Sequence, residues 1–281
     1  MERAFTVAVG DIQVTSIWDG TLDAKLETIR QLDPAEASRR LDHARRETGV
    51  DPLVLPVRAF LIRTAGRTAL VDTGSGKTKG PTMGHLPASL AAIGIAPAAI
   101  DSVLLTHLHM DHIGGLIDEA GRAAFANAEI VMHRKEAEFF IDTPIDRLDE
   151  RSARNVEFQL KALAAYAGRV RRVDEGEGLP GVSARLSPGH TPGHTGWEIA
   201  SRGAAALVLG DVVHMSAIQL PLPMTPMIYD VDPGLAGRTR VAVLDEVMRR
   251  GMLVAGAHLP APGLGRIARA AEGYAFVPGD A

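Results

Sequence analysis

Short runs of apolar residues, separated by turn-forming residues, predict β-strands in the first third of the chain. A glycine beside a small or polar residue, placed between two such runs, is typical of a hairpin. The chain has two of these patterns: the runs 7–9 and 12–14 around Gly10-Asp11, and the runs 56–62 and 68–71 around Ala65-Gly66. We therefore expect two hairpins, the second ending at the tight turn Asp72-Thr73-Gly74.

Farther along the chain, apolar spacing alternates between the strand and the helix period. The predicted strands cover 102–106, 130–132, 182–186, 204–209 and 252–255, and the predicted helices cover 86–95, 134–141, 145–167 and 239–250. Helical spacing at Val156, Leu160 and Leu163 makes 145–167 the segment that we expect to bridge two halves. Because no low-complexity tract or flexible linker divides the chain, residues 1–281 are predicted to form a single α/β domain of two stacked sheets flanked by helices.

Composition narrows the class of protein. Hydrophobic residues make up 46% and charged residues 23% of the 281 positions, as in soluble globular proteins. The formal net charge of -4 provides no basic field for phosphate backbones, so nucleic acid is not an expected partner. The N-terminus lacks the pattern of a signal peptide, and no apolar run is long enough to span a membrane, which predicts a cytoplasmic protein without a membrane partner.

The segment from Thr106 to Gly115 carries the clearest chemical signal. Three imidazoles and one carboxylate, those of His107, His109, Asp111 and His112, follow the apolar run 103–105 directly. Side chains alternate in an extended segment, so His107 and His109 point the same way. If a helix begins near Asp111, then Asp111 and His112 reach the same space. The chain contains no cysteine, so any metal must be held by nitrogen and oxygen donors, which suit zinc or another first-row divalent ion.

Three other apolar strands also end at a donor of the same type. His190 and His194 follow the strand at 182–186 within a loop rich in glycine and proline. We favour His190 as the ligand and His194 as a residue that holds the loop, although the sequence alone does not separate them. Asp211 follows the strand at 204–209, and His258 follows the strand at 252–255. Five histidines and two aspartates are enough for two metals that share a bridging group.

An apolar, proline-rich stretch at 218–229 follows Asp211 and is too broken for a strand or a helix. It is compatible with a wall of the substrate pocket, a contact in a homodimer, or part of the core. Phe139 and Phe140 are predicted mainly to pack a helix, with a pocket lining as the alternative. His214 lies three residues after Asp211, where it can support the bridging group.

These residues, taken in order, resemble the metallo-β-lactamase superfamily. The match runs through Asp72-Thr73-Gly74, His107-x-His109-x-Asp111-His112, His190, Asp211 and His258. The resemblance implies a four-layer αβ/βα sandwich with an internal pseudo-duplication. It also implies that one metal is held by His107, His109 and His190, that the other is held by Asp111, His112 and His258, and that Asp211 bridges them. By the same resemblance Asp72 supports the site without binding metal, and Asp111 transfers a proton to the leaving group.

The C-terminal part is similar to the methyl parathion hydrolase and lactonase branch of that superfamily. The similarity rests on Gly210-Asp211-x-x-His214, Gln219, Asp230-x-Asp232 and the run from Ala257 to Ile267 with Gly273-Tyr274. It implies a hydrolase that uses a metal-bridging hydroxide on a small lactone, ester or phosphotriester. Two zinc ions are the expected cofactor, with iron, manganese or cobalt as alternatives. A thioester hydrolase of the glyoxalase II type and a non-catalytic metal sensor or scaffold are the competing hypotheses.

Overall fold

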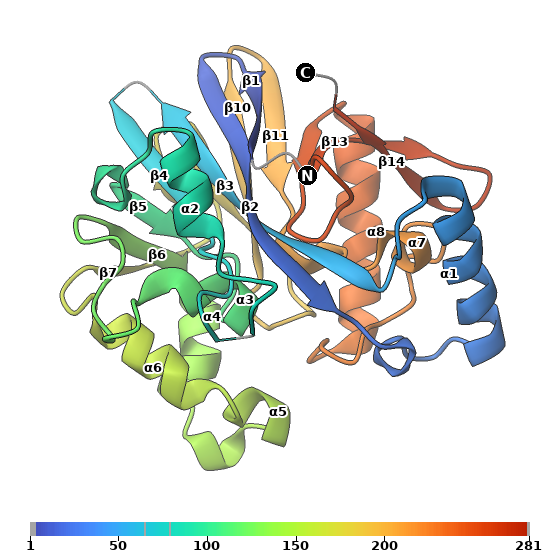
Figure 1. Cartoon of the computed structure of the whole chain (residues 1–281), viewed down its shortest axis with the longest axis horizontal. Helices are drawn as coiled ribbons and strands as arrows, with labels where there is room; N and C mark the ends of the chain where they lie inside the picture. The colour runs from blue at the N-terminus through green and yellow to red at the C-terminus, as the bar shows by residue number, and fades with distance from the viewer. Residues whose placement is uncertain (1–3, 65, 79, 280–281) are drawn as a thin grey trace.

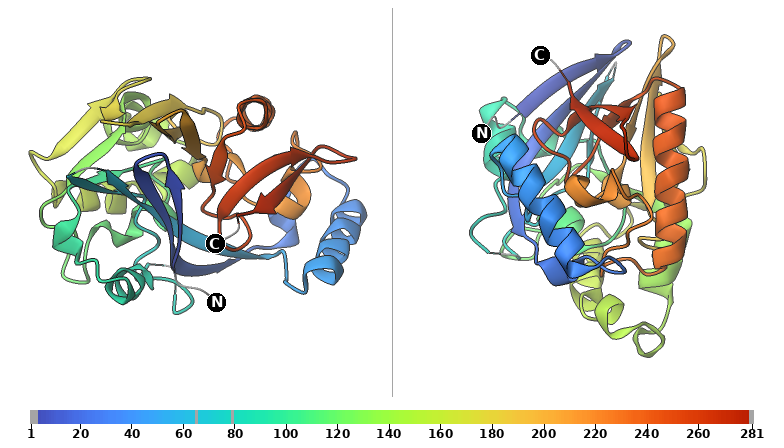
Figure 2. Two further views of the ribbon diagram at one scale, coloured as in Figure 1. Left: turned by 90° about the horizontal axis from the view of Figure 1, so that it is seen from above. Right: turned by 90° about the vertical axis from the view of Figure 1, so that its right-hand side faces the viewer.

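Two seven-stranded β-sheets pack face to face, and helices cover their outer faces (Figures 1 and 2). The structure is a computed structural model that describes residues 4–64, 66–78 and 80–279. The first sheet has the order β1-β2-β3-β4-β5-β6-β7, and the second has the order β14-β13-β12-β11-β10-β9-β8. This arrangement confirms the predicted αβ/βα sandwich, in which each half of the chain contributes one sheet.

The strands of each sheet follow the chain without exchange between the halves. The first sheet contains β1 (Ala4–Val9), β2 (Ile12–Asp23), β3 (Val54–Thr64), β4 (Arg67–Val71), β5 (Ser102–Leu104), β6 (Glu129–His133) and β7 (Val170–Val173). The second contains β8 (Gly178–Leu179), β9 (Val182–Leu186), β10 (Thr195–Ser201), β11 (Ala204–Val208), β12 (Leu253–Ala255), β13 (Leu264–Arg269) and β14 (Tyr274–Pro278). The helices are α1 (Pro34–Thr48), α2 (Leu86–Ala92), α3 (Met110–Ile113), α4 (Arg134–Ala137), α5 (Glu150–Ala153), α6 (Val156–Ala164), α7 (Ser216–Gln219) and α8 (Pro233–Arg249).

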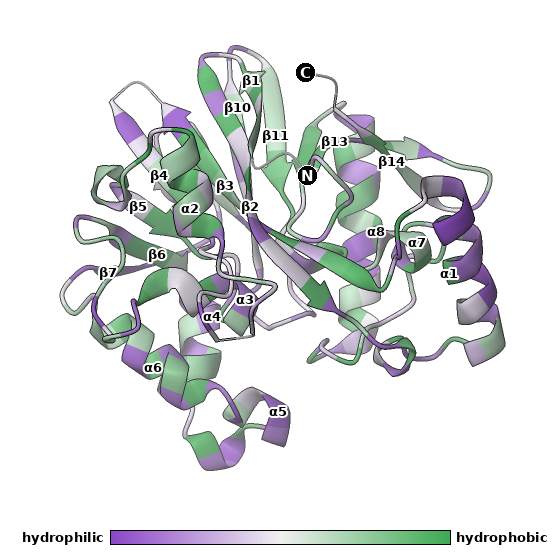
Figure 3. Cartoon of the chain, in the orientation of Figure 1, coloured by the Kyte–Doolittle hydropathy of each residue, from purple (hydrophilic) through white to green (hydrophobic). Residues whose placement is uncertain are grey.

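The strand β3 shows why apolar runs such as 59–62 form the centre of this fold. Its side chains alternate, so Phe60 and Ile62 pack between the two sheets, while Ala59 and Leu61 pack under the helices of the first half. Both faces are buried, which accounts for a nearly continuous apolar run where a sheet with one wet face would alternate. In Figure 3 the central strands are accordingly hydrophobic, whereas α1 at the periphery is largely hydrophilic.

Both predicted hairpins are present. β1 pairs with β2 in antiparallel register, with Val9 opposite Ile12, and β3 pairs with β4, with Thr64 opposite Arg67. Ala65, in the second predicted turn, lies outside the described residues. Gly10 is in the left-handed region (φ 58°), and a side chain there would collide with the Ser201 backbone, which explains the glycine.

All but one of the predicted helices are present, with ends that differ from the predicted ones. The helix predicted at 86–95 ends at Ala92, and α8 begins at Pro233, earlier than the predicted 239, because the Asp232 side chain caps it. The continuous helix predicted over 145–167 is wrong: the segment contains a short 3-10 turn and then α5 and α6. Its Leu160 is 45% exposed and therefore is not part of the helical core stripe.

That segment also does not bridge the two halves. α6 packs on the core of the first half, and β7 after it still pairs with β6 of the first sheet. The chain crosses to the second sheet only between β7 and β8. None of the helices in the described ranges has both the length and the apolar character needed to cross a membrane.

Strand direction places the predicted donors at one edge. β11 and β12 run parallel, and β9 runs the same way because it is antiparallel to β10, which is antiparallel to β11. The loops that follow these three strands therefore leave the second sheet at the same edge. The Thr195 backbone N–H donates to the Thr106 carbonyl (2.8 Å), and the Trp197 indole donates to the Leu105 carbonyl (3.2 Å), so the end of β5 meets this edge.

Candidate metal centre

The segment after β5 presents its donors as the sequence predicts. His107 and His109 flank Leu108, which is fully buried, and His109 has extended backbone angles. α3 begins at Met110, so the predicted helix start near Asp111 is confirmed. The Leu108 backbone is held on both sides: its N–H donates to Glu136 Oε1 (2.9 Å), and its carbonyl accepts from Gln159 Nε2 (2.8 Å).

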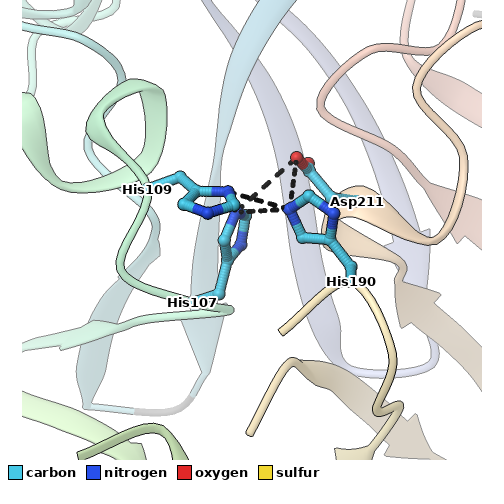
Figure 4. A group of neighbouring side chains, drawn as sticks. All are labelled: His107, His109, His190 and Asp211. Atoms are coloured by element: carbon cyan, nitrogen blue, oxygen red, sulfur yellow. Dashed lines mark hydrogen bonds and ion pairs between the residues drawn. The ribbon is translucent and has the colours of Figure 1, made fainter. Parts of the chain in front are cut away.

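His107, His109, His190 and Asp211 form a first group of donors (Figure 4). His109 Nδ1 lies 3.1 Å from His107 Nε2 and 2.9 Å from His190 Nε2, and the two Nε2 atoms are 3.2 Å apart. Asp211 Oδ2 lies 3.6 Å from His107 Nε2 and 3.4 Å from His190 Nε2. Donors bound tetrahedrally to zinc at about 2.0–2.1 Å would be separated by ~3.3 Å, close to these distances.

Asp111, His112 and His258 form a second group beside the first. The other oxygen of Asp211, Oδ1, lies 3.1 Å from His112 Nε2 and 3.3 Å from His258 Nε2. Asp111 Oδ2 lies 3.7 Å from His112 Nε2 and 3.5 Å from His258 Nε2. Asp211 therefore directs one oxygen to each group, as a bridging carboxylate would.

Hydrogen bonds from behind the site orient three of the imidazoles. His112 Nδ1 lies 2.8 Å from Asp72 Oδ2, His190 Nδ1 lies 3.0 Å from Asp230 Oδ1, and His258 Nδ1 donates to the Pro56 carbonyl at 2.7 Å. Each contact leaves the Nε2 atom directed at Asp211. Such outer partners fix ring orientation and increase ligand basicity at metal sites. Asp72 itself lies at the end of β4 with φ 58°, a conformation that non-glycine residues rarely adopt.

The geometry separates His190 from His194. His194 Nδ1 donates to the Ser187 carbonyl (3.0 Å), and its Nε2 accepts the backbone N–H of Asp211 (2.9 Å). Both ring nitrogens are therefore in use, and the ring holds the loop of His190 to the turn that carries Asp211. His190 keeps Nε2 directed at the first group, so the structure places His190 and not His194 among these donors, and its role as a ligand stays a prediction.

Burial and charge set the protonation of the donors. Burial lowers the pKa of His109 to about 4 and that of His190 to about 3, and it lowers the pKa of His107 well below its ordinary value. These imidazoles are therefore neutral and carry lone pairs at neutral pH. Burial would raise the pKa of Asp211, but the imidazoles of His112, His214 and His258 lower it well below its ordinary value.

The arrangement leaves buried polar atoms that a cation between them would satisfy. His112 Nε2 and Asp211 Oδ1 are buried without a hydrogen-bond partner. A neutral imidazole has one N–H. In His190 this N–H faces Asp230, and in His107 it faces the Thr106 hydroxyl, so the Nε2 atoms of both rings carry lone pairs toward the group. Converging lone pairs repel one another unless a positive ion lies between them. The residues thus fit two divalent ions, and the individual ligand roles stay predictions.

A cavity of about 340 Å³ opens onto these donors. Its floor includes His109, Asp111 and Asp211, and its apolar walls include Leu22 and Phe140. A larger hollow of about 630 Å³ lies between α2 and α6, but none of the seven predicted ligands lines it. The larger of these two cavities is therefore not the one at the predicted metal centre.

The proline-rich stretch at 218–229 divides between two of its three predicted roles. Ile218, Leu220 and Met227 are buried in the core, whereas Ile228 and Tyr229 line the cavity. Its first residues complete the single turn of α7, so the stretch is not wholly irregular. The predicted contact in a homodimer stays a prediction. Phe140 likewise packs in the core and also reaches the cavity.

The sequence predicted no role in the site for two supporting residues. Asp230 orients His190, although in the sequence it is only one residue of the lactonase-like motif. Glu136 accepts from the Leu108 N–H, the Thr191 hydroxyl and the Gly193 N–H, so it ties together the loops of both halves. Burial raises the pKa of Glu136 to about 7. His214, predicted to support the bridge, has Nε2 2.9 Å from Asp211 Oδ2 and stacks on His258.

Comparison with known proteins places this geometry in context. The family model of the metallo-beta-lactamase superfamily matches residues 52–258. An N-acyl homoserine lactonase of Bacillus thuringiensis is 24% identical over 205 residues, which span 65% of this chain and 75% of that protein. The crystal structure of AbOPH, a hydrolase in the beta lactamase superfamily, aligns with a TM-score of 0.92 at 28% identity and covers 100% of this chain and 98% of its own. AidC, a dizinc quorum-quenching lactonase solved with the product N-hexanoyl-L-homoserine, aligns with a TM-score of 0.89 at 25% identity, covering 99% and 97%.

Proposed function

The chain belongs to the metallo-β-lactamase superfamily, and from this premise we propose that it is a dinuclear metal-dependent hydrolase that opens small lactones. It is a hydrolase of ester bonds, and aryl esters and phosphotriesters are the related substrates that the same chemistry would accept. The observation that carries the proposal is Asp211, whose two oxygens each face a separate group of donors at the floor of one cavity.

The chain's own groups suit this reaction. Divalent ions held by the two donor groups would supply the Lewis acidity that activates water and polarises the substrate carbonyl. His107, His109 and His190 would hold one ion, Asp111, His112 and His258 the other, and Asp211 would bridge them. Likeness to a dizinc lactonase supports zinc as the metal.

We assign proton transfer to Asp111. Of the two carboxylates in the site, Asp111 is the more accessible, with its side chain 16% exposed compared with 3% for Asp211. It also lines the cavity. The imidazoles of His112 and His258 help to lower its pKa against the effect of burial, so the carboxylate is ionised and can take a proton and pass it to the leaving alkoxide.

A substrate panel on zinc-reconstituted protein tests the proposal. N-hexanoyl homoserine lactone, a 4-nitrophenyl ester, an aryl phosphotriester and a glutathione thioester would be compared at equal concentration, with lactone opening followed by acid release. We expect the lactone to give the highest kcat/KM. His190→Ala should abolish turnover, and His43→Ala, on the exposed face of α1, should leave it unchanged.

Two outcomes would contradict the proposal. A folded protein with two bound metal ions that opens neither the lactone nor the ester is not a hydrolase of this class. Preference for the thioester by an order of magnitude would favour the glyoxalase II type of activity instead.

A further inference from the structure

The cavity above the donors has a one-sided charge. Apart from the predicted metal ligands Asp111 and Asp211, the formally charged residues among its lining are Arg151 and Arg154, and no other Asp or Glu is among the lining residues. Both arginines belong to the α5–α6 segment, which projects from the body of the molecule (Figure 1). The apolar residues of its lining include Leu22, Leu55 and Phe140.

The two arginines differ in how far they are engaged. The Arg151 guanidinium donates to the Ile228 carbonyl and lies 6.0 Å from the centre of the Tyr229 ring, so it ties α5 to the loop of the cavity wall. The Arg154 side chain is 69% exposed, and its one ion pair in the described ranges is with Glu150 at 3.4 Å. The Glu150 side chain is 93% exposed, and such surface pairs add little. Arg154 is therefore available to a ligand.

Asn155 adds an uncharged donor next to Arg154. It stands at the start of α6, where its side chain makes no capping hydrogen bond, and it also lines the cavity. A guanidinium and an amide side by side suit a carboxylate, because guanidinium groups bind carboxylates through two parallel hydrogen bonds.

From these features we infer that the enzyme prefers lactones or esters whose acyl chain ends in an anionic group, of which a carboxylate is the representative. The inference rests on the proposed hydrolase function. In this binding mode the scissile carbonyl lies at the donors, the methylene chain contacts apolar residues of the lining such as Leu22 and Phe140, and the terminal carboxylate meets Arg154 and Asn155. Cationic groups at the mouth would also steer such substrates into the cavity, and this effect weakens as salt is added.

A matched pair of substrates tests the inference. 4-Nitrophenyl hexanoate and the mono-4-nitrophenyl ester of adipic acid have the same chain length and leaving group and differ only in the terminal carboxylate. For the zinc-loaded wild type we expect kcat/KM to be about tenfold higher for the charged ester, mainly through KM. That factor corresponds to about 1.4 kcal/mol, and it should shrink as the ionic strength rises.

Two variants separate a local contact from overall charge. Arg154→Gln should lower kcat/KM for the charged ester about tenfold and leave the neutral ester within about twofold. Arg147→Gln removes the same charge from an exposed residue that lies just before α5 and does not line the cavity, and it should change the kcat/KM of neither ester.

The outcomes distinguish the inference from the proposed function. Equal rates for the two esters, or equal losses for both in Arg154→Gln, would overturn the inference while leaving the hydrolase function intact. Inertness of both esters and of the lactones, in protein with two metal ions bound, would overturn the proposed function itself.

Discussion

Asp211 occupies a position that no neutral side chain can fill. Each of its oxygens faces a different donor group, at 3.4 Å from His190 Nε2 and 3.3 Å from His258 Nε2. In Asp211→Asn one oxygen becomes an NH₂ group, which cannot bind a cation. We expect the variant to keep at most one metal equivalent per chain, by elemental analysis, and to lose about a hundredfold to a thousandfold in kcat, the range seen when a group that stabilises the transition state is removed. Two retained equivalents with normal turnover would show that Asp211 does not bridge.

His194 should act on the metal through Asp211. Because its ring links the Ser187 carbonyl to the Asp211 N–H, His194→Ala leaves all seven predicted ligands in place but frees the turn that carries Asp211. Losing an outer partner of this kind typically costs about 10–100-fold in metal affinity. Titration with zinc under a competing chelator should show that loss, and excess zinc should restore most of the activity. If activity is not restored, His194 has a role beyond positioning.

Glu136 makes stability depend on pH. Burial raises its pKa from 4.5 to about 7, so the folded state binds the proton more tightly than the unfolded state. Its contribution is therefore fully present below about pH 4.5 and is lost as the pH rises to about 7, by up to ~3 kcal/mol. Glu136→Gln removes this titration but places an NH₂ group against N–H donors. Urea unfolding of the metal-free protein should show the variant less stable at pH 5, with the gap narrowing by pH 7.5. A gap that is constant across this range would contradict the assignment.

At the scale of single residues, the sequence predicted the donors better than their supports. Four of the donors form a local sequence pattern: His107, His109, Asp111 and His112. Each remaining donor follows an apolar run, and that run predicts the strand that positions the donor. Glu136 has no such signal, because it lies in an amphipathic helical stretch. Its partners are backbone groups and a hydroxyl 28 to 57 positions away.

Among the elements, the segment from 145 to 164 departs most from its predicted form. Asp149 caps α5 by accepting from the Arg151 and Ser152 N–H groups, and Asn155 starts α6 anew, so two short helices replace one. Periodicity alone does not reveal such a break, because Val156 and Leu163 still carry the helical spacing of α6.

The two hairpins were predictable because their turns are local in the sequence. The parallel pairing of β11 with β12 joins residues more than 40 positions apart and has no local signature.

The cap of α5 should affect substrate binding more than stability. In Asp149→Ala we expect α5 to fray, so that Arg151 and Arg154 are no longer held at the cavity. KM for the mono-4-nitrophenyl ester of adipic acid should then rise several-fold, with little change in kcat. The stability cost should be about 1 kcal/mol, as for other capping residues. Asp33→Ala is the matched control, because Asp33 caps α1, a helix without residues in the cavity lining. Similar stability losses with KM raised only in Asp149→Ala would confirm the role, and an unchanged KM would contradict it.

Across the whole molecule, the predicted metal centre joins the two sheets. His107, His109, Asp111 and His112 follow β5 of the first sheet, whereas His190, Asp211 and His258 follow strands of the second. Ions bound there would hold the two halves together at the edge where the cavity opens. Ligands that bind only the folded state stabilise it by mass action, by about 4 kcal/mol at a thousand times Kd.

Metal removal should therefore destabilise the entire fold, not only the site. For a chain of this size each kcal/mol corresponds to roughly 2–4 °C in Tm, so chelation should lower Tm by on the order of 10 °C, and added zinc should reverse the loss. Differential scanning calorimetry of the zinc-loaded and chelated protein measures the shift. Asp211→Asn is the matched test, because a variant that cannot bridge should gain less than half of the wild-type increment when zinc is added. If the chelated and zinc-loaded wild type unfold at the same temperature, the ions do not link the two sheets, even if they support catalysis.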